Sequence, residues 1–205
     1  MKVLMINGSP RPDGNTKIAL SEMGRVFEKE GIEFEIFDLG RREVHGCVAC
    51  YYCKSHEGCA FDDGVAELSK KLCEADALVI GSPVYYASAN GTLISLLDRL
   101  FYSTGFDKRM KVGASVVVAR RGGLSSSFDQ LNKYFAIAGM PIATSQYWNS
   151  VHGALEGEAR GDEEGLQTMR VLAKNMVFLM RSIALGREKY GLPEKETKIK
   201  TNFIR

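Results

Sequence analysis

The chain has 205 residues, enough for one well-cored domain, and its 45% apolar and 25% charged residues are ordinary values for a globular protein. Twenty-seven basic residues against 25 acidic ones leave a net charge of +2, which supplies no strong field for nucleic acid or an anionic membrane. No apolar run approaches the ~20 residues that span a bilayer, and the run Val3 to Ile6 is too short for the core of a signal peptide. We therefore expect a cytoplasmic protein with no membrane or nucleic-acid partner.

Short apolar runs alternate along the chain with longer segments of helical period, which predicts βα units and a parallel sheet. The expected strands are residues 3–6, 34–39, 77–82, 112–119 and 141–148. The expected helices are residues 15–30, 62–73, 90–103, 125–138 and 162–190. The pattern predicts a single α/β domain over residues 1–205, with helices on both faces of a five-stranded parallel sheet and a cysteine-rich insertion at residues 40–62.

The segment NGSPRPDGNTK follows the first strand and opens a helix near Asn15 or Thr16. Exposed backbone N–H groups and the positive end of a helix favour an anion, and Ser9 and Arg11 add a hydroxyl and a positive charge. The segment matches neither G-x-x-x-x-G-K-[ST] nor G-x-G-x-x-G, which argues against a P-loop or a standard dinucleotide site. Taken alone, it fits a phosphate site and a solvent-exposed turn with an N-cap equally well.

Two further loops follow expected strands. The segment SPVYYASANGT after the third strand places Tyr85 and Tyr86 in a turn, and the Gly-rich segment ARRGGLSSS follows the fourth strand. In a doubly wound sheet the ligand binds outside the carboxyl ends of the strands. A phosphate loop, an aromatic loop and a Gly-rich loop at this edge together predict a pocket for a phosphorylated flat ring, and FMN fits that description.

Through GSPRPDGNT, GSPVYY and LLDRLF, the chain resembles the flavodoxin-like NADPH-dependent FMN reductase family over essentially its whole length. The resemblance implies a three-layer flavodoxin-like fold with strand order 2-1-3-4-5, in which bound FMN carries the chemistry without a catalytic side chain. It also implies three groups of FMN contacts: Ser9, Arg11, Asn15 and Thr16 at the phosphate; Pro83, Val84, Tyr85 and Tyr86 along the ring; and Arg120, Gly122 and Gly123 at its far edge.

Four of the five cysteines form the compact pattern C-x2-C-x2-C-x5-C, at Cys47, Cys50, Cys53 and Cys59. Structural zinc sites usually join two ligand pairs across a dozen or more residues, whereas short consecutive gaps are typical of ferredoxin-type runs around a [4Fe–4S] cluster. The motif resembles that of the iron–sulfur flavoproteins, which pass electrons between ferredoxin-like donors and FMN. A packing loop without a cluster stays open, because Ala60 stands where ferredoxins place proline.

The segment around the second expected helix carries two smaller predictions. Asp62 and Asp63 are expected to cap the helix start, and Cys73 is expected to face the core together with Leu68 and Leu72. The insertion leaves the second strand at the edge expected for FMN, so the cysteines and the flavin are predicted to be neighbours.

Three functions are compatible with these patterns. The first is an FMN-dependent oxidoreductase with a cluster beside the flavin, linked to NAD(P)H or to a ferredoxin-like partner. The second is a cluster-free NAD(P)H-dependent FMN or quinone reductase, and the third is a non-catalytic electron carrier like a flavodoxin. The family resemblance implies a homodimer or homotetramer, and the choice between NADH and NADPH stays open.

Overall fold

The computed structural model describes residues 1–199, 201 and 203. Its sheet runs in the order β2-β1-β3-β5-β6, with β4 paired to β3. The parallel strands are β1 (Lys2–Asn7), β2 (Glu33–Asp38), β3 (Ala77–Tyr85), β5 (Val112–Ala119) and β6 (Ser150–His152), and β4 (Ser88–Ala89) is antiparallel to β3. The predicted α/β fold and the order of its parallel strands are confirmed, with β4 as an addition.

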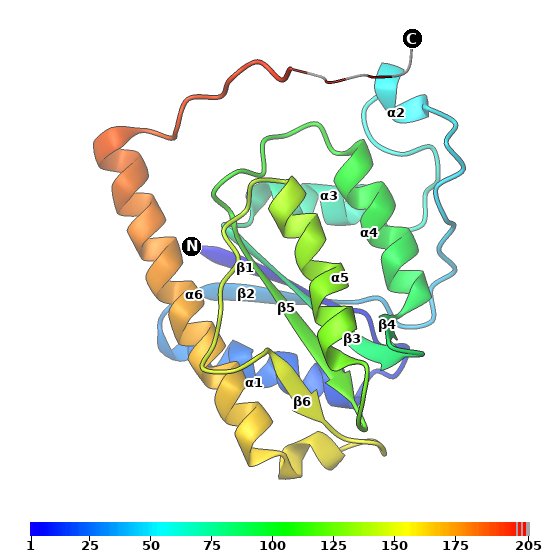
Figure 1. Cartoon of the computed structure of the whole chain (residues 1–205), viewed down its shortest axis with the longest axis vertical. Coiled ribbons are helices and arrows are strands. Elements are labelled where there is room, and N and C mark those ends of the chain that lie inside the picture. Colours follow the sequence, from blue (N-terminus) through cyan, green and yellow to red (C-terminus); the bar gives the residue numbers. More distant parts are fainter. Residues whose placement is uncertain (200, 202, 204–205) are drawn as a thin grey trace.

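Helices cover both faces of this sheet (Figure 1). They are α1 (Asn15–Lys29), the short α2 (Tyr52–Ser55), α3 (Val65–Glu74), α4 (Gly91–Ser103), α5 (Leu124–Ile137) and α6 (Glu163–Tyr190), with a 3-10 turn η1 (Glu158–Gly161) before α6. One hydrophobic core joins the sheet to α1 and α6, and the other joins it to α3, α4 and α5. Among the described residues, no helix combines the length and the apolar character needed to cross a membrane.

The fifth parallel strand is not where the sequence predicts it, and the prediction for residues 141–148 is wrong. Ile142 forms only an isolated bridge with Gly113 of β5. The chain then turns to α6, where Asn175 Nδ2 donates a hydrogen bond of 2.7 Å to the Thr144 carbonyl. This contact holds the chain toward α6 after the bridge, and the chain pairs with β5 again only at β6.

The start of α3 also differs from its prediction. The helix begins at Val65, after Gly64 in a left-handed conformation with φ of 105°. Neither side chain of the preceding acidic pair caps it, and the Asp63 carboxylate is paired with Arg99 instead. A glycine tolerates this positive φ without the steric penalty of a side chain, which allows the chain to turn sharply into the helix.

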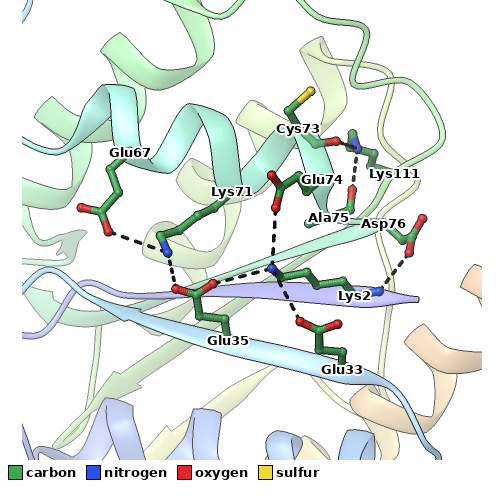
Figure 2. A network of polar contacts seen from close by, with 10 residues as sticks. All are labelled: Lys2, Glu33, Glu35, Glu67, Lys71, Cys73, Glu74, Ala75, Asp76 and Lys111. Carbon is green, nitrogen blue, oxygen red and sulfur yellow. Dashed lines mark hydrogen bonds and ion pairs between the residues drawn. The ribbon is translucent and has the colours of Figure 1, made fainter.

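Cys73 is exposed at the end of α3 and does not face the core, in contrast to its prediction. Leu68 and Leu72 are fully buried on the inner side of the helix. Lys111 Nζ donates a hydrogen bond of 3.0 Å to the Cys73 carbonyl, while the thiol points away from the surrounding ion pairs (Figure 2). Cys73 therefore serves as a control for the four cysteines of the insertion.

The amino-terminal end of the sheet carries ion pairs between strands and α3 (Figure 2). Lys2 Nζ lies 3.7 Å from Glu33 Oε1, 3.9 Å from Glu35 Oε2 and 3.8 Å from Glu74 Oε2. A hydrogen bond to Glu35 raises the pKa of Lys71. Such solvent-accessible ion pairs contribute little to the stability of a fold. The loops that follow β1, β3 and β5 lie at the opposite, carboxyl-terminal edge of the sheet.

Candidate cofactor site

The loop between β1 and α1 presents an open helix end. The N-cap of α1 is Gly14, which has no side chain to cap the helix, and the first turn contains no acidic residue. Within the described part of the chain, no acceptor takes a hydrogen bond from the N–H groups of residues 15–17. Ser9 and Thr16 are buried beside this end, and Arg11 is exposed. Free N–H groups at the positive end of a helix fit a phosphate.

The side chain of Asn15, which is predicted to contact the phosphate, instead binds the segment before α6. Its side-chain Nδ2 donates a hydrogen bond of 2.8 Å to the Leu155 carbonyl, and its Oδ1 accepts one of 3.1 Å from the Ala159 N–H. A Cβ added at Gly153 would lie 2.6 Å from Asn15 Nδ2, so this segment packs tightly against the amide. The side chain of Asn15 thus anchors residues 153–159, and its backbone N–H is the group that is free for a phosphate.

Asn90 joins the first loop to the third strand, a role that local sequence reasoning missed. Its Nδ2 donates a hydrogen bond of 3.0 Å to the Gly8 carbonyl, and its N–H donates one of 3.0 Å to Ser82 Oγ. Its Oδ1 also caps α4 by accepting from the Thr92 N–H at 2.8 Å. An asparagine before a helical pattern signals the cap. No local signal indicates its bond to Gly8.

The aromatic turn joins β3 to β4 in a tight hairpin. Its two central residues, Tyr86 and Ala87, have φ of 49° and 58°. Two-residue hairpin turns require positive φ, which is costly for residues other than glycine, asparagine and aspartate. Tyr86 is fully exposed and Tyr85 is 46% exposed, whereas Pro83 and Val84 are half-buried. The turn therefore presents aromatic surface to a ligand at the cost of local strain.

The Gly-rich turn after β5 is locked against this hairpin. A Cβ added at Gly123, where φ is 87°, would lie 2.6 Å from the Ala87 Cα. Ser126 Oγ donates a hydrogen bond of 2.6 Å to the Ala87 carbonyl. Gly122 and Arg120 are exposed. The structure thus brings the loops after β1, β3 and β5 together at the carboxyl edge of the sheet.

The cysteine insertion leaves β2 at this same edge but does not stay there. Its four predicted ligands line one pocket together with Arg99 and Ser103, at the carboxyl-terminal end of α4. The opposite end of α4, which begins after Asn90, contacts the first loop, and Figure 1 shows β4 and α2 at the two ends of this helix. Thirteen helical residues span about 20 Å, so within one chain the pocket is separated from the loops after β1 and β3.

The cysteine pocket contains all four thiols and no carboxylate. Its cysteines are Cys47, Cys50, Cys53 and Cys59. The first two are exposed and the last two are half-buried. In the part of the chain that the structure describes, no three thiol, imidazole or carboxylate groups converge closely enough to hold a metal ion. The donor set fits an iron–sulfur cluster, whereas the loop is more open than a closed coordination site.

Arg99 is the second residue that sequence reasoning missed. It is only 2% exposed and forms an ion pair with Asp63. Partial burial by itself raises the pKa of Asp63, but hydrogen bonds from Arg99 and from the His45 N–H outweigh it and lower that pKa. The hydrogen bond to Asp63 raises the pKa of Arg99. Arg99 lies three residues after Leu96 on the leucine-rich face of α4. A charged residue on a buried face is usually paired with an opposite charge, so this position in the sequence could have indicated an ion pair.

The parallel sheet with loops gathered at its carboxyl edge defines a flavodoxin-like α/β protein. Among solved structures, the fold is similar to RosB with a bound riboflavin-phosphate intermediate, at a TM-score of 0.74 and 18% identity, covering 100% of this chain and 94% of that one. Residues 1–154 match the family described as NADPH-dependent FMN reductase. The chain belongs to this family and is an FMN-dependent oxidoreductase.

Two relatives match most of the chain. An iron–sulfur flavoprotein of Methanocaldococcus jannaschii is 36% identical over 191 residues, which cover 89% of this chain and 99% of the relative. An iron–sulfur flavoprotein of Methanosarcina thermophila is 29% identical over 194 residues, covering 92% of this chain and all of the relative.

Proposed function

We propose that this oxidoreductase holds FMN at the carboxyl edge of the sheet and a [4Fe–4S] cluster in the cysteine pocket, and that electrons pass between the two. The observation that carries the proposal is the pocket itself, which is lined by four thiols and no carboxylate. Thiolates are the usual ligands of such clusters. The names of two relatives aligned over most of this chain, both iron–sulfur flavoproteins, support a cluster of this kind.

In this proposal the phosphate of FMN lies over the open end of α1, where the N–H groups of residues 15–17 and the Arg11 side chain supply positive charge. The hairpin turn at Tyr86 lines the ring and the turn at Gly123 approaches its far edge, and contacts between the two turns fix their relative positions. Bound FMN supplies hydride and single-electron chemistry. The protein contributes orientation and electrostatics, and no side chain is required as an acid or base.

In the cysteine pocket, Cys47, Cys50, Cys53 and Cys59 each supply one thiolate. A cluster supplies single-electron exchange when bound. The insertion has only one four-residue helix, α2, and positive φ at Ala49, where φ is 52°. Such an exposed loop lacks the ladder hydrogen bonds that would resist rearrangement, so the thiols are able to draw together around a ligand.

An anaerobic absorption spectrum with iron and sulfide analysis tests the proposal. We expect flavin bands, broad cluster absorption and about four iron atoms per chain. Replacing any one of the four pocket cysteines by alanine should lower the iron content while FMN stays bound, and Cys73→Ala should leave both unchanged because Cys73 lies outside the pocket. An anaerobically reconstituted wild type that binds FMN without iron contradicts the cluster.

That outcome would favour a cluster-free NAD(P)H-dependent FMN or quinone reductase, an alternative supported by the family match. We propose NAD(P)H or a ferredoxin-like protein as the electron donor. Steady-state oxidation of NADH and of NADPH, with a quinone or free flavin as acceptor, identifies the nucleotide if one is used. Electron uptake only from a reduced ferredoxin would indicate the ferredoxin-linked form. No turnover with either donor would indicate a carrier of the flavodoxin type.

We also propose that the chain works as a homodimer or homotetramer. The cysteine pocket and the flavin loops lie at opposite ends of α4, about 20 Å apart by helix length. Aromatic side chains are exposed at both places, namely Tyr51, which is 62% exposed beside the cysteine pocket, and Tyr86, which is fully exposed in the turn after β3. A second copy would cover such surface and bring its own flavin close to this pocket. Light scattering that gave the 22.6 kDa mass of the monomer would contradict this proposal.

A further inference from the structure

Arg99 ties the two ends of the cysteine insertion together. Its Nη1 donates a hydrogen bond of 2.9 Å to the His45 carbonyl, before the first cysteine of the motif. Its Nε donates one of 3.3 Å to Cys59 Sγ, the last cysteine. The ion pair with Asp63 holds the guanidinium in place from a third side. A planar guanidinium with five donors is suited to such a junction, whereas a lysine has a single ammonium group.

Ser103 lies one helical turn after Arg99 on the same face of α4 and also lines the cysteine pocket. The residue is 8% exposed, and its hydroxyl is buried without a hydrogen-bond partner among the described residues. The adjacent Thr104 hydroxyl donates a hydrogen bond of 2.7 Å to the Leu100 carbonyl, as helix hydroxyls commonly do. A buried hydroxyl without a partner costs about 1–3 kcal/mol, so a group that accepts from Ser103 in the pocket would remove this penalty.

We propose that Arg99 and Ser103 are positioning residues that form the hydrogen-bonding wall of the cysteine pocket and raise the reduction potential of the cluster bound there. Arg99 acts through Cys59, whose sulfur it already contacts, and Ser103 offers its free hydroxyl to a sulfur of the cluster. The inference rests on the proposed function, because it requires that the four cysteines hold a [4Fe–4S] cluster.

The direction of the effect follows from charge. A cluster held by four thiolates is anionic, and its one-electron reduction adds a further negative charge without breaking a bond. Hydrogen-bond donors and a nearby guanidinium stabilise the more negative state most, so they raise the potential. Asp63 neutralises part of the Arg99 charge, which leaves the directed hydrogen bond to Cys59 as the main contribution of this side chain.

The test uses the full chain with bound FMN, reconstituted anaerobically with iron and sulfide. The variants are Ser103→Ala, which removes the hydroxyl, Ser103→Thr, which keeps it, and Ser182→Ala on the exposed side of α6 as a control. Iron content is measured first, and then the cluster signal is followed by low-temperature paramagnetic resonance in a dithionite titration. We expect wild-type iron content in all three variants, with a more negative midpoint potential only in Ser103→Ala.

Arg99→Lys provides the second arm, because it keeps a positive charge and loses the planar fork. We expect a more negative potential than in the wild type and a lower iron content than in Ser103→Ala, since Cys59 loses its fixed position. If the wild type contains the cluster and both Ser103→Ala and Arg99→Lys have the same midpoint potential as the wild type, this inference is wrong while the proposed cluster stands. A wild type that binds FMN but no iron overturns the proposed cluster, and the inference with it.

Discussion

The proposed flavin site and the cysteine insertion are held by different kinds of contact. At the carboxyl edge of the sheet, Asn90 and the Gly8–Gly81 backbone hydrogen bond join the first loop to β3, and Gly123 packs directly on the hairpin. In the insertion, residues 40–62 contain a single short helix, and Arg99 supplies the main polar connections to the rest of the protein. The loops of the proposed flavin site are therefore fixed against one another without a ligand, whereas the cysteine insertion is held mainly by one side chain.

The largest expected effect comes from Arg99→Ala. Removing one partner of a buried ion pair leaves the other charge uncompensated, which costs about 3–5 kcal/mol of folding free energy. Urea unfolding measures this loss. Arg181→Ala is the matched control, because Arg181 pairs with Glu30 while its side chain is 51% exposed, and its loss should cost less than about 1 kcal/mol. Equal effects of the two substitutions would contradict the view that Arg99 is the main anchor of the insertion.

Gly123→Ala should have the next largest effect, and Gly157→Ala is its control. The two glycines have φ of 87° and 88°, but an added Cβ would meet Ala87 only at Gly123, and open space at Gly157. We expect Gly157→Ala to cost about 1 kcal/mol for backbone strain. The contact at Gly123 adds about 1–3 kcal/mol. Thermal unfolding compares them, and Gly123→Ala should also weaken FMN binding because it separates the two turns.

Replacing Arg11 and Thr16 together, as Arg11→Ala with Thr16→Val, tests the phosphate end of the flavin site. Each hydrogen bond contributes about 0.5–1.5 kcal/mol net, so losing two should weaken binding by about 1–3 kcal/mol and raise the dissociation constant of FMN about 10- to 100-fold. Titration of the apoprotein by flavin fluorescence measures this change. Arg25→Ala removes a charge from the exposed side of the same helix and should leave the affinity unchanged. An unaltered affinity in the double variant would count against this placement of the phosphate.

The smallest effect is the acid dependence of the Arg99 anchor. The pKa of Asp63 is lowered in the folded protein, so its ionised form stabilises the fold above its unfolded value near 3.8, and this contribution is lost as the pH falls below about 4. The stability difference between wild type and Asp63→Asn should therefore stay constant above about pH 5 and shrink as the pH falls below about 4. Urea midpoints across this range test it, and a constant difference would exclude an ionised Asp63.

Sequence patterns predicted most of the fold because parallel strands buried on both faces read as continuous apolar runs. All eight residues of β5 are buried, and the predicted bounds of this strand are those observed. The last helix, α6, also begins close to its predicted start, and Asp162 caps it by accepting a hydrogen bond of 3.0 Å from the Gly165 N–H. These features depend on residues near one another in the chain, so local spacing is sufficient to identify them.

What the sequence by itself determined is the parallel α/β fold, the three loops at the carboxyl edge and the four-cysteine pattern. Only the tertiary structure decided where the last strand pairs, because the Thr144 carbonyl is satisfied by Asn175 of α6, 31 residues away. It likewise decided that Asp63 pairs with Arg99, 36 residues along the chain, and does not cap α3. Contacts at such separations depend on how helices dock on the sheet, and that packing leaves no periodic signal in a short stretch of sequence.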